Sequence, residues 1–425
     1  MDKYEDVRWF MSSKTVVLGG SGAMTSGCVY DLHQTSDFDE VVVADADEEN
    51  ARRLVDLLDD DRFRFEQVDA TDTDDLVRVL EGADYVVNGL PYPFESNVLD
   101  AMERVGDLTG VDLNAFDFEG VLDRSEEFAE AGNSLWFANG GLVSTIALGM
   151  VGCDQFEEVE DVNFYWGMWR LLTQTTPGLT DTVTYEHDPD VDERAKWEDG
   201  EVINDLPAFS EQRKFKFPEP IGEEETYVIS HPEPITFPQS PIAQEKNVDR
   251  IITRGAWHDE WKDYERTLHA SDAFETDSVE VDGMEVDPVE VMQQQVKNQG
   301  LELETQWKPP EELSPDTEWT PQTVLSAEVT GTVDSQGDRA VFHLEQPTPF
   351  FDVEEITVMR EYGCYVGVPL SVTLQLMADD VVDKDGIFIT ETSGLDADRY
   401  LEEMEKRGFD LVAEQTPSKS IAAQN

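Results

Sequence analysis

The chain is 425 residues long, more than one ordinary hydrophobic core holds, so we expect two domains or more. Hydrophobic residues make up 39% of it, which excludes a disordered chain. Its 94 acidic and 30 basic residues give a formal net charge of -64, which argues against nucleic acid as a partner because phosphate backbones bind basic patches.

The acidic residues are spread along the whole sequence and are not gathered in one tail. At roughly 1 M salt the Debye length falls to about 3 Å, so repulsion between carboxylates is quenched there. This distribution predicts a halophilic protein that works in a very salty cytoplasm.

The three cysteines, Cys28, Cys153 and Cys364, are far apart and show no CxxC spacing. This pattern favours neither a disulfide framework nor a zinc site, and it is typical of a reducing compartment. The sequence contains no apolar run of the ~18 residues that a membrane span needs, and residues 1–11 lack a signal-peptide pattern. We therefore expect a cytoplasmic protein that does not bind a membrane.

The first 150 residues alternate between short apolar strands and helices. Strands are predicted at 15–18, 41–44, 64–68, 85–87, 109–113 and 135–137, and helices at 24–32, 47–58, 72–80, 95–105 and 118–131. Six apolar strands separated by helices predict a doubly wound parallel α/β sheet, the Rossmann arrangement.

The pattern changes after residue 150. Residues 151–360 read as an α+β domain that carries an aromatic strand at 162–169, proline-rich connections and a hairpin with strands at 325–333 and 339–344. Residues 361–425 contain an apolar helix at 367–377, a strand at 386–389 and a helix at 397–407. We expect this C-terminal segment to return to the first domain.

A glycine-rich turn follows the first strand. Gly20 and Gly22 fill the first two positions of GxGxxG, and Thr25 takes the third, where a larger side chain would hold the helix further from the strand. This turn and the helix start predict a dinucleotide-binding site at Gly20, Ser21, Gly22, Ala23 and Met24. By itself, an ordinary glycine-rich turn explains the motif almost equally well.

The second strand ends at Asp45, at the spacing expected for the acid that binds the ribose hydroxyls. Such an acid repels a 2′-phosphate, so NAD is the predicted cofactor. Arg52 and Arg53 leave NADP open, and a helix cap is the alternative role of Asp45.

The third and fourth predicted strands also end in residues suited to a ligand at the carboxyl edge of the sheet. These cofactor-site candidates are Asp69, Ala70, Asn88, Gly89, Leu90 and Pro91. For the Asn88–Gly89 pair the alternative is a plain turn.

These segments resemble the saccharopine dehydrogenase-like family, especially its short lysine-dehydrogenase members and its carboxynorspermidine-forming relatives. Residues 17–32 are similar to the family's opening VLGAGxxGxxxAxDL, residues 68–70 to its VDA, residues 87–91 to its N/GALP, and residues 386–391 with 400–408 to its closing GVxxPE…FLxxLxxRG. The resemblance implies a Rossmann domain with an inserted substrate and dimerisation domain. It also implies NAD(P)-dependent C–N chemistry on an amino-acid-type substrate, without a metal, and we expect a homodimer.

One loop departs from that resemblance. The family carries DxGxxPG after the sixth strand, whereas residues 137–145 here read FANGGLVST and lack both the Asp and the Pro. This departure argues against saccharopine itself as the substrate.

Candidates for chemistry follow from this arrangement. Asp112 could accept a substrate ammonium, with a helix cap as an equal alternative, and His231 could act as an acid or base, although a single histidine is more often structural. Substrate contacts are predicted for Tyr92, Asn139 and Arg170. We expect an oxidoreductase acting on the C–N bond of an amino-acid-derived amine. The alternatives are a non-catalytic dinucleotide sensor and a polyamine-forming reductase.

Overall fold

The computed structural model describes residues 13–115, 117–169, 172, 180, 194–219, 221–274, 278–298, 322–334, 336–345 and 362–415. Within them the chain forms two compact units. The first contains residues 1–138 and 373–388, and the second contains residues 139–372 and 389–425.

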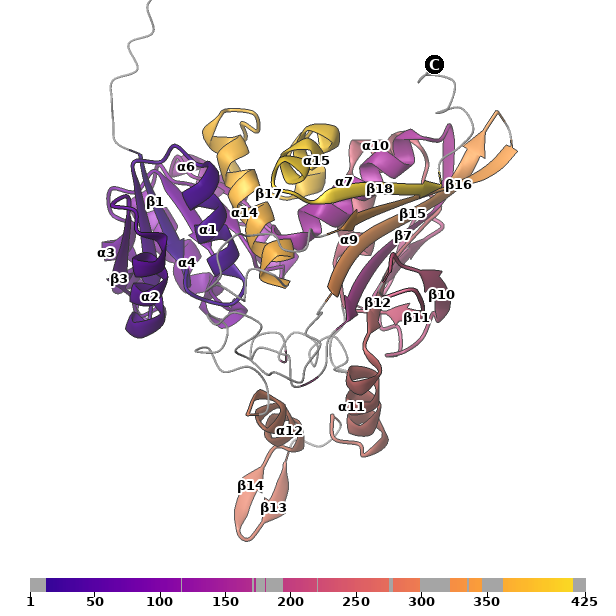
Figure 1. Cartoon of the computed structure of the whole chain (residues 1–425), viewed down its shortest axis with the longest axis horizontal. Coiled ribbons are helices and arrows are strands. Elements are labelled where there is room, and N and C mark those ends of the chain that lie inside the picture. The colour runs from indigo at the N-terminus through magenta and orange to yellow at the C-terminus, as the bar shows by residue number, and fades with distance from the viewer. Residues whose placement is uncertain are drawn as a thin grey trace, which may run out of the picture. The chain divides into compact units, whose positions relative to one another are not determined.

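The first unit is built on a seven-stranded parallel sheet (Figure 1, where its strands within residues 14–136 are indigo to purple). Its strands are β1 (Lys14–Leu18), β2 (Glu40–Asp45), β3 (Phe63–Gln67), β4 (Tyr85–Asn88), β5 (Thr109–Asp112), β6 (Ser134–Trp136) and β17 (Gly386–Phe388). Their order is β17-β6-β5-β4-β1-β2-β3, and every neighbouring pair is parallel. The order reverses at β1 and β4, which confirms the predicted doubly wound sheet.

Strand β17 is the expected C-terminal return. It pairs with β6, with Ile387 opposite Leu135, and Ser125 bonds both the N–H and the C=O of Ile387 at 2.9 Å. Gly386 has φ +77°, and a Cβ there would lie 2.5 Å from the Ser125 carbonyl oxygen. A glycine is therefore needed where β17 enters the sheet.

The helices of the first unit are α1 (Thr25–Thr35), α2 (Glu48–Leu58), α3 (Thr73–Leu80), α4 (Glu95–Val105), α5 (Phe118–Leu122) and α6 (Ser125–Glu130), with the short 3-10 turn η1 (Tyr92–Phe94) before α4. Acidic side chains cap three of these helices, α2, α3 and α5. Asp47 caps α2 by accepting from the Asn50 N–H, and Asp72 caps α3 by accepting from the Asp74 N–H. These bonds satisfy amides that the helices themselves leave free.

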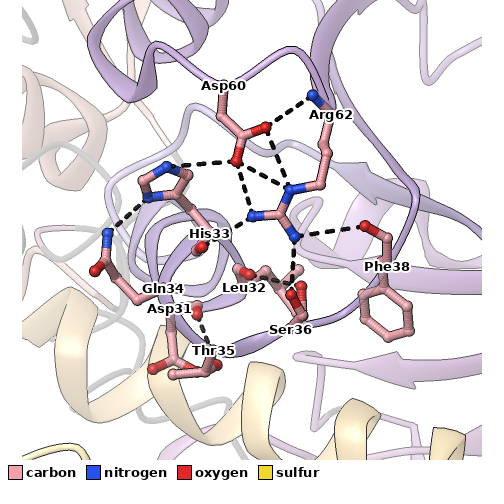
Figure 2. A network of polar contacts seen from close by, with 9 residues as sticks. All are labelled: Asp31, Leu32, His33, Gln34, Thr35, Ser36, Phe38, Asp60 and Arg62. Carbon is pink, nitrogen blue, oxygen red and sulfur yellow. Dashed lines mark hydrogen bonds and ion pairs between the residues drawn. The ribbon is translucent and has the colours of Figure 1, made fainter.

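The C-terminal end of α1 is closed by an arginine (Figure 2). The Arg62 guanidinium donates to the carbonyl oxygens of Ser36 at 2.8 Å and His33 at 3.1 Å. Asp60 binds the same guanidinium at 2.8 Å, and this contact holds the pKa of Asp60 below its ordinary value. A cation at this end complements the helix dipole and satisfies the last carbonyls.

The second unit contains a nine-stranded mixed sheet. Its strands are β7 (Glu158–Trp169), β8 (Lys196–Glu198), β9 (Glu201–Ile203), β10 (Arg213–Lys216), β11 (Glu223–Val228), β12 (Arg250–Trp257), β15 (Gln322–Val333), β16 (Gln336–Glu345) and β18 (Asp410–Gln415). Strands β7 and β12 are parallel, and the other pairs are antiparallel. The predicted hairpin is confirmed as β15 and β16.

One face of this sheet is covered by a helix, and residues of the other face lie in a buried apolar cluster. Helix α7 (Gly141–Asp154) lies against β7, β15 and β16 (Figure 1). Its glycines allow this approach, because a Cβ on Gly149 would lie 2.6 Å from the Phe164 ring. Successive strand residues point to opposite faces, and on the other face Tyr165 stacks on Phe215, with ring centroids 3.8 Å apart.

The remaining elements of the second unit are short, apart from three helices. They are α9 (Glu233–Thr236), η3 (Phe237–Gln239), α10 (Pro241–Glu245), α11 (Asp259–Ala270), β13 (Val279–Val281), β14 (Met284–Val286), α12 (Pro288–Lys297), η6 (Thr390–Thr392) and α15 (Ala397–Lys406). Helix α14 (Tyr362–Ala378) contributes residues to both units.

The contact-defined units differ from the expected domain boundaries in two places. The first unit ends at residue 138 and not at 150, because α7 packs against the second sheet. Of the expected C-terminal return, residues 373–388 join the first unit. Residues 389–415 belong to the second, where β18 pairs with β16.

No helix in the described part of the chain has the length and apolar character to cross a membrane.

Candidate functional site

The glycine turn after β1 is shaped by three glycines. Gly19, with φ +65°, donates its N–H to the Ala44 carbonyl oxygen at 2.8 Å. A Cβ on Gly20 would lie 3.0 Å from both Val17 O and Val43 Cγ1, so this glycine lets the turn lie directly on β1 and β2. The left-handed residue is thus Gly19, one position before the glycine that the motif assigned to the tight turn.

The same turn presents backbone donors. Ser26 N–H donates to Gly22 O at 2.9 Å as α1 begins, whereas the Ala23 and Met24 amides have no hydrogen-bond acceptor among the described residues. Unpaired amides at a helix N-terminus suit the oxygens of a phosphate group. Gly22 adds room, because it has no side chain to stand between those amides and a ligand.

Thr25 occupies the third position of the motif without displacing the helix into solvent. It is 1% exposed, and a Cβ on Gly89 would lie 2.1 Å from its Oγ1 and 2.7 Å from its Cγ2. The missing glycine on α1 is therefore compensated by a glycine at the end of β4. The sequence shows both residues but gives no sign that they touch.

Asp45, at the end of β2, binds the glycine turn. Its Oδ2 accepts from the Ser21 N–H at 3.0 Å and the Ser21 hydroxyl at 2.7 Å, and its Oδ1 accepts from the Asp47 N–H at 3.0 Å. The carboxylate keeps further lone pairs for ribose hydroxyls. Asp47, and not Asp45, is the cap of α2. Arg52 is one of the two arginines that kept NADP as an alternative cofactor, and its Nε donates to Glu48 at 2.8 Å.

The end of β3 is more exposed. Asp69 accepts from the Thr71 N–H and hydroxyl at 2.9 and 2.6 Å, and these bonds hold the pKa of Asp69 below its ordinary value. Ala70 is buried, and its carbonyl oxygen accepts from Asn97 Nδ2 at 2.9 Å. Pro91 and Tyr92 are exposed at the start of η1, where 45% of Tyr92 is accessible.

Asn88 and Asp112 meet at the carboxyl ends of β4 and β5. Asn88 Nδ2 donates to Asp112 Oδ2 at 2.7 Å, and Asp112 Oδ1 accepts from the Asn114 N–H at 2.8 Å. Asp112 has no exposed surface. Its carboxylate is thus surrounded by the protein's own donors, and the contacts fit a positioning role better than the expected capture of a substrate ammonium.

In the second unit, His231 faces a buried carboxylate. Its Nδ1 lies 2.9 Å from Glu233 Oε2, and its ring lies against Trp166, with centroids 4.5 Å apart. Glu233 has no exposed surface, and it also accepts from Thr145 Oγ1 at 2.9 Å and Thr253 Oγ1 at 3.1 Å.

Burial by itself would raise the pKa of Glu233, but the neighbouring His231 and the hydrogen bonds hold it below its ordinary value. An ionised Glu233 accepts, so Nδ1 of His231 is the protonated nitrogen and Nε2 is left for other contacts. This is the pairing of a base with a carboxylate that orients it. A second acid of the same unit, Glu391, is buried, and burial raises its pKa to about 7.

The altered loop at 137–145 contacts the His231–Glu233 pair, because Thr145 donates to Glu233. Gly141 begins α7, and a Cβ there would lie 2.5 Å from the Trp166 ring, so the glycine lets the helix approach the tryptophan that covers His231. Asn139 is 1% exposed, and its Oδ1 accepts from the Gly140 N–H at 2.7 Å. Arg170, the expected carboxylate clamp, lies outside the described residues.

The structure adds three acids that the sequence analysis did not select. Glu95 lies beside Asp112, and Glu233 and Glu391 lie in the second unit. Glu95 reads as an ordinary acid in the first turn of a helix. Glu233 directly follows His231-Pro232, and this spacing is the only signal the sequence offered. Among the described residues, no group of three or more His, Cys, Asp or Glu side chains is placed to hold a metal ion.

Comparison with known proteins supports this assignment of the first unit. Residues 15–132 match the family model of the saccharopine dehydrogenase NADP binding domain. The apo saccharopine dehydrogenase (L-Glu forming) from Saccharomyces cerevisiae has a similar fold, with a TM-score of 0.66 at 14% identity over 95% of this chain and 100% of that one.

Other solved structures are similar over a smaller part of the chain. Pen from Bacillus thuringiensis aligns over 30% of this chain and 50% of its own at 17% identity, with a TM-score of 0.25. Residues 15–132 therefore carry a domain of the saccharopine dehydrogenase NADP binding type, and the chain shares its fold with that dehydrogenase along almost the whole length.

Proposed function

We propose that this protein is an NAD(P)-dependent oxidoreductase that acts on the C–N bond of an amino-acid-derived amine. The observation that carries the dinucleotide part is the Gly19–Gly22 turn, where the Ala23 and Met24 amides meet no acceptor among the described residues. It lies at the carboxyl end of β1, at the point where the strand order reverses. The matched NADP-binding family model supports the same cofactor class.

A bound nicotinamide would supply the hydride acceptor or donor. The chain's part at this turn is to bind and orient: the free amides and the N-terminus of α1 would hold the pyrophosphate. The carboxylate of Asp45 would accept from ribose hydroxyls and repel a 2′-phosphate, so NAD is the proposed cofactor.

The Asp45 assignment needs a matched control, because Asp45 also holds Ser21. D45S should narrow the ratio of NADPH to NADH dissociation constants by about tenfold or more, since removing the charge removes repulsion of the phosphate. S21A loses only the hydroxyl contact and should weaken both cofactors alike. Titrations of the wild type, D45S and S21A with NADH and with NADPH in molar KCl measure these dissociation constants. A wild type that binds NADPH more tightly than NADH would refute this role of Asp45.

We propose His231 as the acid–base residue, with Glu233 as its positioning residue. Because Glu233 accepts from Nδ1, Nε2 is the atom that would exchange a proton with the substrate nitrogen. H231N should lower kcat by about 10²-fold or more, the usual size of such a contribution, and leave NADH affinity unchanged. A kcat within about threefold of the wild type would remove His231 from the mechanism.

E233Q tests the positioning role separately. An amide NH₂ in place of either carboxylate oxygen would face donors, since Thr145 and Trp166 donate to Oε1, and His231 and Thr253 adjoin Oε2. We expect E233Q to shift the pH dependence of kcat as well as to lower it. A lowered melting temperature with an unshifted pH profile would mean that Glu233 is only structural.

The function as a whole is tested by following nicotinamide absorbance in molar KCl with a panel of amino acids, and with amine and keto-acid pairs. Turnover of one such substrate supports the proposal. NADH binding that G22V abolishes, without turnover of any substrate, would favour the alternative of a dinucleotide sensor. A polyamine-forming reductase would instead couple a diamine to an aldehyde.

A further inference from the structure

Two carboxyl groups are buried together in the first unit. Glu95, in the first turn of α4, is 3% exposed, and Asp112, at the end of β5, has no exposed surface. The proposed reaction uses neither of them. A buried acid is costly to keep unless it is neutral or well bonded, so this pair needs a physical account.

Two asparagines bridge the acids. Asn88 Nδ2 lies 2.7 Å from Asp112 Oδ2 and 3.4 Å from Glu95 Oε2. Asn114 Nδ2 lies 2.5 Å from Glu95 Oε2 and 3.0 Å from Asp112 Oδ1. Each amide therefore contacts both carboxyl groups.

The shared asparagines hold the two carboxyl groups close together in a buried place. Two ionised carboxylates repel each other strongly there, so one of the two keeps a proton. Burial, and the charge of Asp112 next, raise the pKa of Glu95 to about 10. Burial also raises the pKa of Asp112, but bonds from Asn88, Glu95 and Asn114 oppose that rise. Glu95 is thus the acid that keeps the proton.

Other charged groups around the pair lie further out. Arg124, between α5 and α6, lowers the pKa of Glu95, but its guanidinium is bound to Asp100 and Glu103. Helix α3, which packs on α4, presents charged residues on its exposed side: Asp74, Asp75 and Arg78. Tyr92 of η1 is the nearest titratable group along the chain before Glu95.

The same two asparagines also hydrogen-bond the backbone of Leu90. The Leu90 N–H donates to Asn88 Oδ1 at 3.2 Å, and its carbonyl oxygen accepts from Asn114 Nδ2 at 3.1 Å. The Leu90 side chain meets the glycine turn, where a Cβ on Gly19 would lie 3.3 Å from Leu90 Cδ2. The acid pair is therefore connected to the wall of the dinucleotide site through two asparagines and one leucine.

We propose that Glu95 and Asp112 share one proton and act as positioning residues that hold Leu90 against the glycine turn in the shape that binds the dinucleotide. This inference rests on the proposed dinucleotide binding. Loss of the shared proton would leave two negative charges side by side in a buried place, and they would separate. Asn88 and Asn114 would then release the Leu90 backbone.

The first test compares NADH dissociation constants near pH 8 and near pH 10.5 in molar KCl. In the wild type the constant should rise by about tenfold or more, because this interval crosses the ionisation of Glu95. In E95Q, whose side chain cannot ionise, the rise should be smaller than about threefold. The matched control E126Q removes an exposed acid of α6 and should keep the wild-type ratio. Equal ratios in the wild type and E95Q would refute the proposal.

D112N gives a second, opposite expectation. Asp112 accepts from Asn88 Nδ2, from Asn114 Nδ2 and from the Asn114 N–H, so an amide NH₂ there would face donors. NADH affinity should therefore fall by about tenfold in D112N at both pH values. Unchanged affinity in a folded D112N protein would also overturn the positioning role.

An infrared measurement separates this inference from the proposed function. A protonated buried acid gives a carboxylic-acid carbonyl band near pH 8. Burial also raises the pKa of Glu265, so the readout is the band that the wild type has and E95Q lacks in the difference spectrum of the two proteins, whether or not NADH is bound. If the band is present but NADH does not bind, the proposed function fails and the shared proton stands. If NADH binds but the band is missing from the difference spectrum, the shared proton is refuted.

Discussion

The contact between Thr25 and Gly89 gives a sharp test of how the glycine turn is built. G89A places a methyl group 2.1 Å from Thr25 Oγ1 and 3.0 Å from its Cβ. Thr25 is 1% exposed and cannot turn away into solvent. Overpacking of this kind costs about 1–3 kcal/mol. At about 2–4 °C for each kcal/mol in a unit of this size, we expect a melting temperature lower by roughly 2–12 °C.

T25G should relieve that clash, because it removes the side chain that the methyl group meets. Alone it costs roughly 1–2 kcal/mol, since it leaves a small cavity and adds a flexible residue to the start of α1. The double variant G89A/T25G should then be more stable than the sum of the single effects by about 1–2 kcal/mol.

Thermal melts in molar KCl, followed by circular dichroism and paired with NADH titrations, measure this cycle. G337A is the matched control, because a Cβ on Gly337 meets nothing within 4 Å, and its melting temperature should stay within about 1 °C. If G89A melts like the wild type, or if the double variant shows no coupling, the packing of α1 on β4 is not as described.

Three further predictions concern stability. R62A should lower the free energy of unfolding by about 1–2 kcal/mol, because the carbonyl oxygens of His33 and Ser36 lose their donor; R62K, which lacks the planar fork, should recover little in the same melts. Burial raises the pKa of Glu391 to about 7 from an ordinary 4.5, so its favourable contribution is complete below pH 4.5 and is lost as the pH rises through 7. The wild type should lose up to roughly 3 kcal/mol between these values relative to E391Q, and parallel curves of melting temperature against pH would contradict this. Dilution from molar KCl to about 0.1 M should lower the melting temperature, because at -64 the folded chain repels itself when the Debye length grows to about 10 Å; a salt-independent melt would refute the halophilic hypothesis.

The sequence by itself determined the elements of the first unit and their class. Continuous apolar strands such as 41–44, separated by capped helices, are possible only in a sheet covered on both faces, and the structure has that sheet. The hairpin at β15 and β16 and the return strand β17 were predicted as well. These features are local, because periodicity and turn residues are properties of short stretches of chain.

Only the tertiary structure decided which distant residues meet. Thr145 and Glu233 are 88 positions apart and share a hydrogen bond, and Thr25 fits against Gly89 although neither residue marks the other in the sequence. Glu95 looks like a solvated acid at the start of a helix until the fold brings it to Asp112 and removes both from water. Whether a carboxyl group is a surface charge, a cap or a buried acid depends on solvent access and on neighbours from other elements, and a single sequence specifies neither.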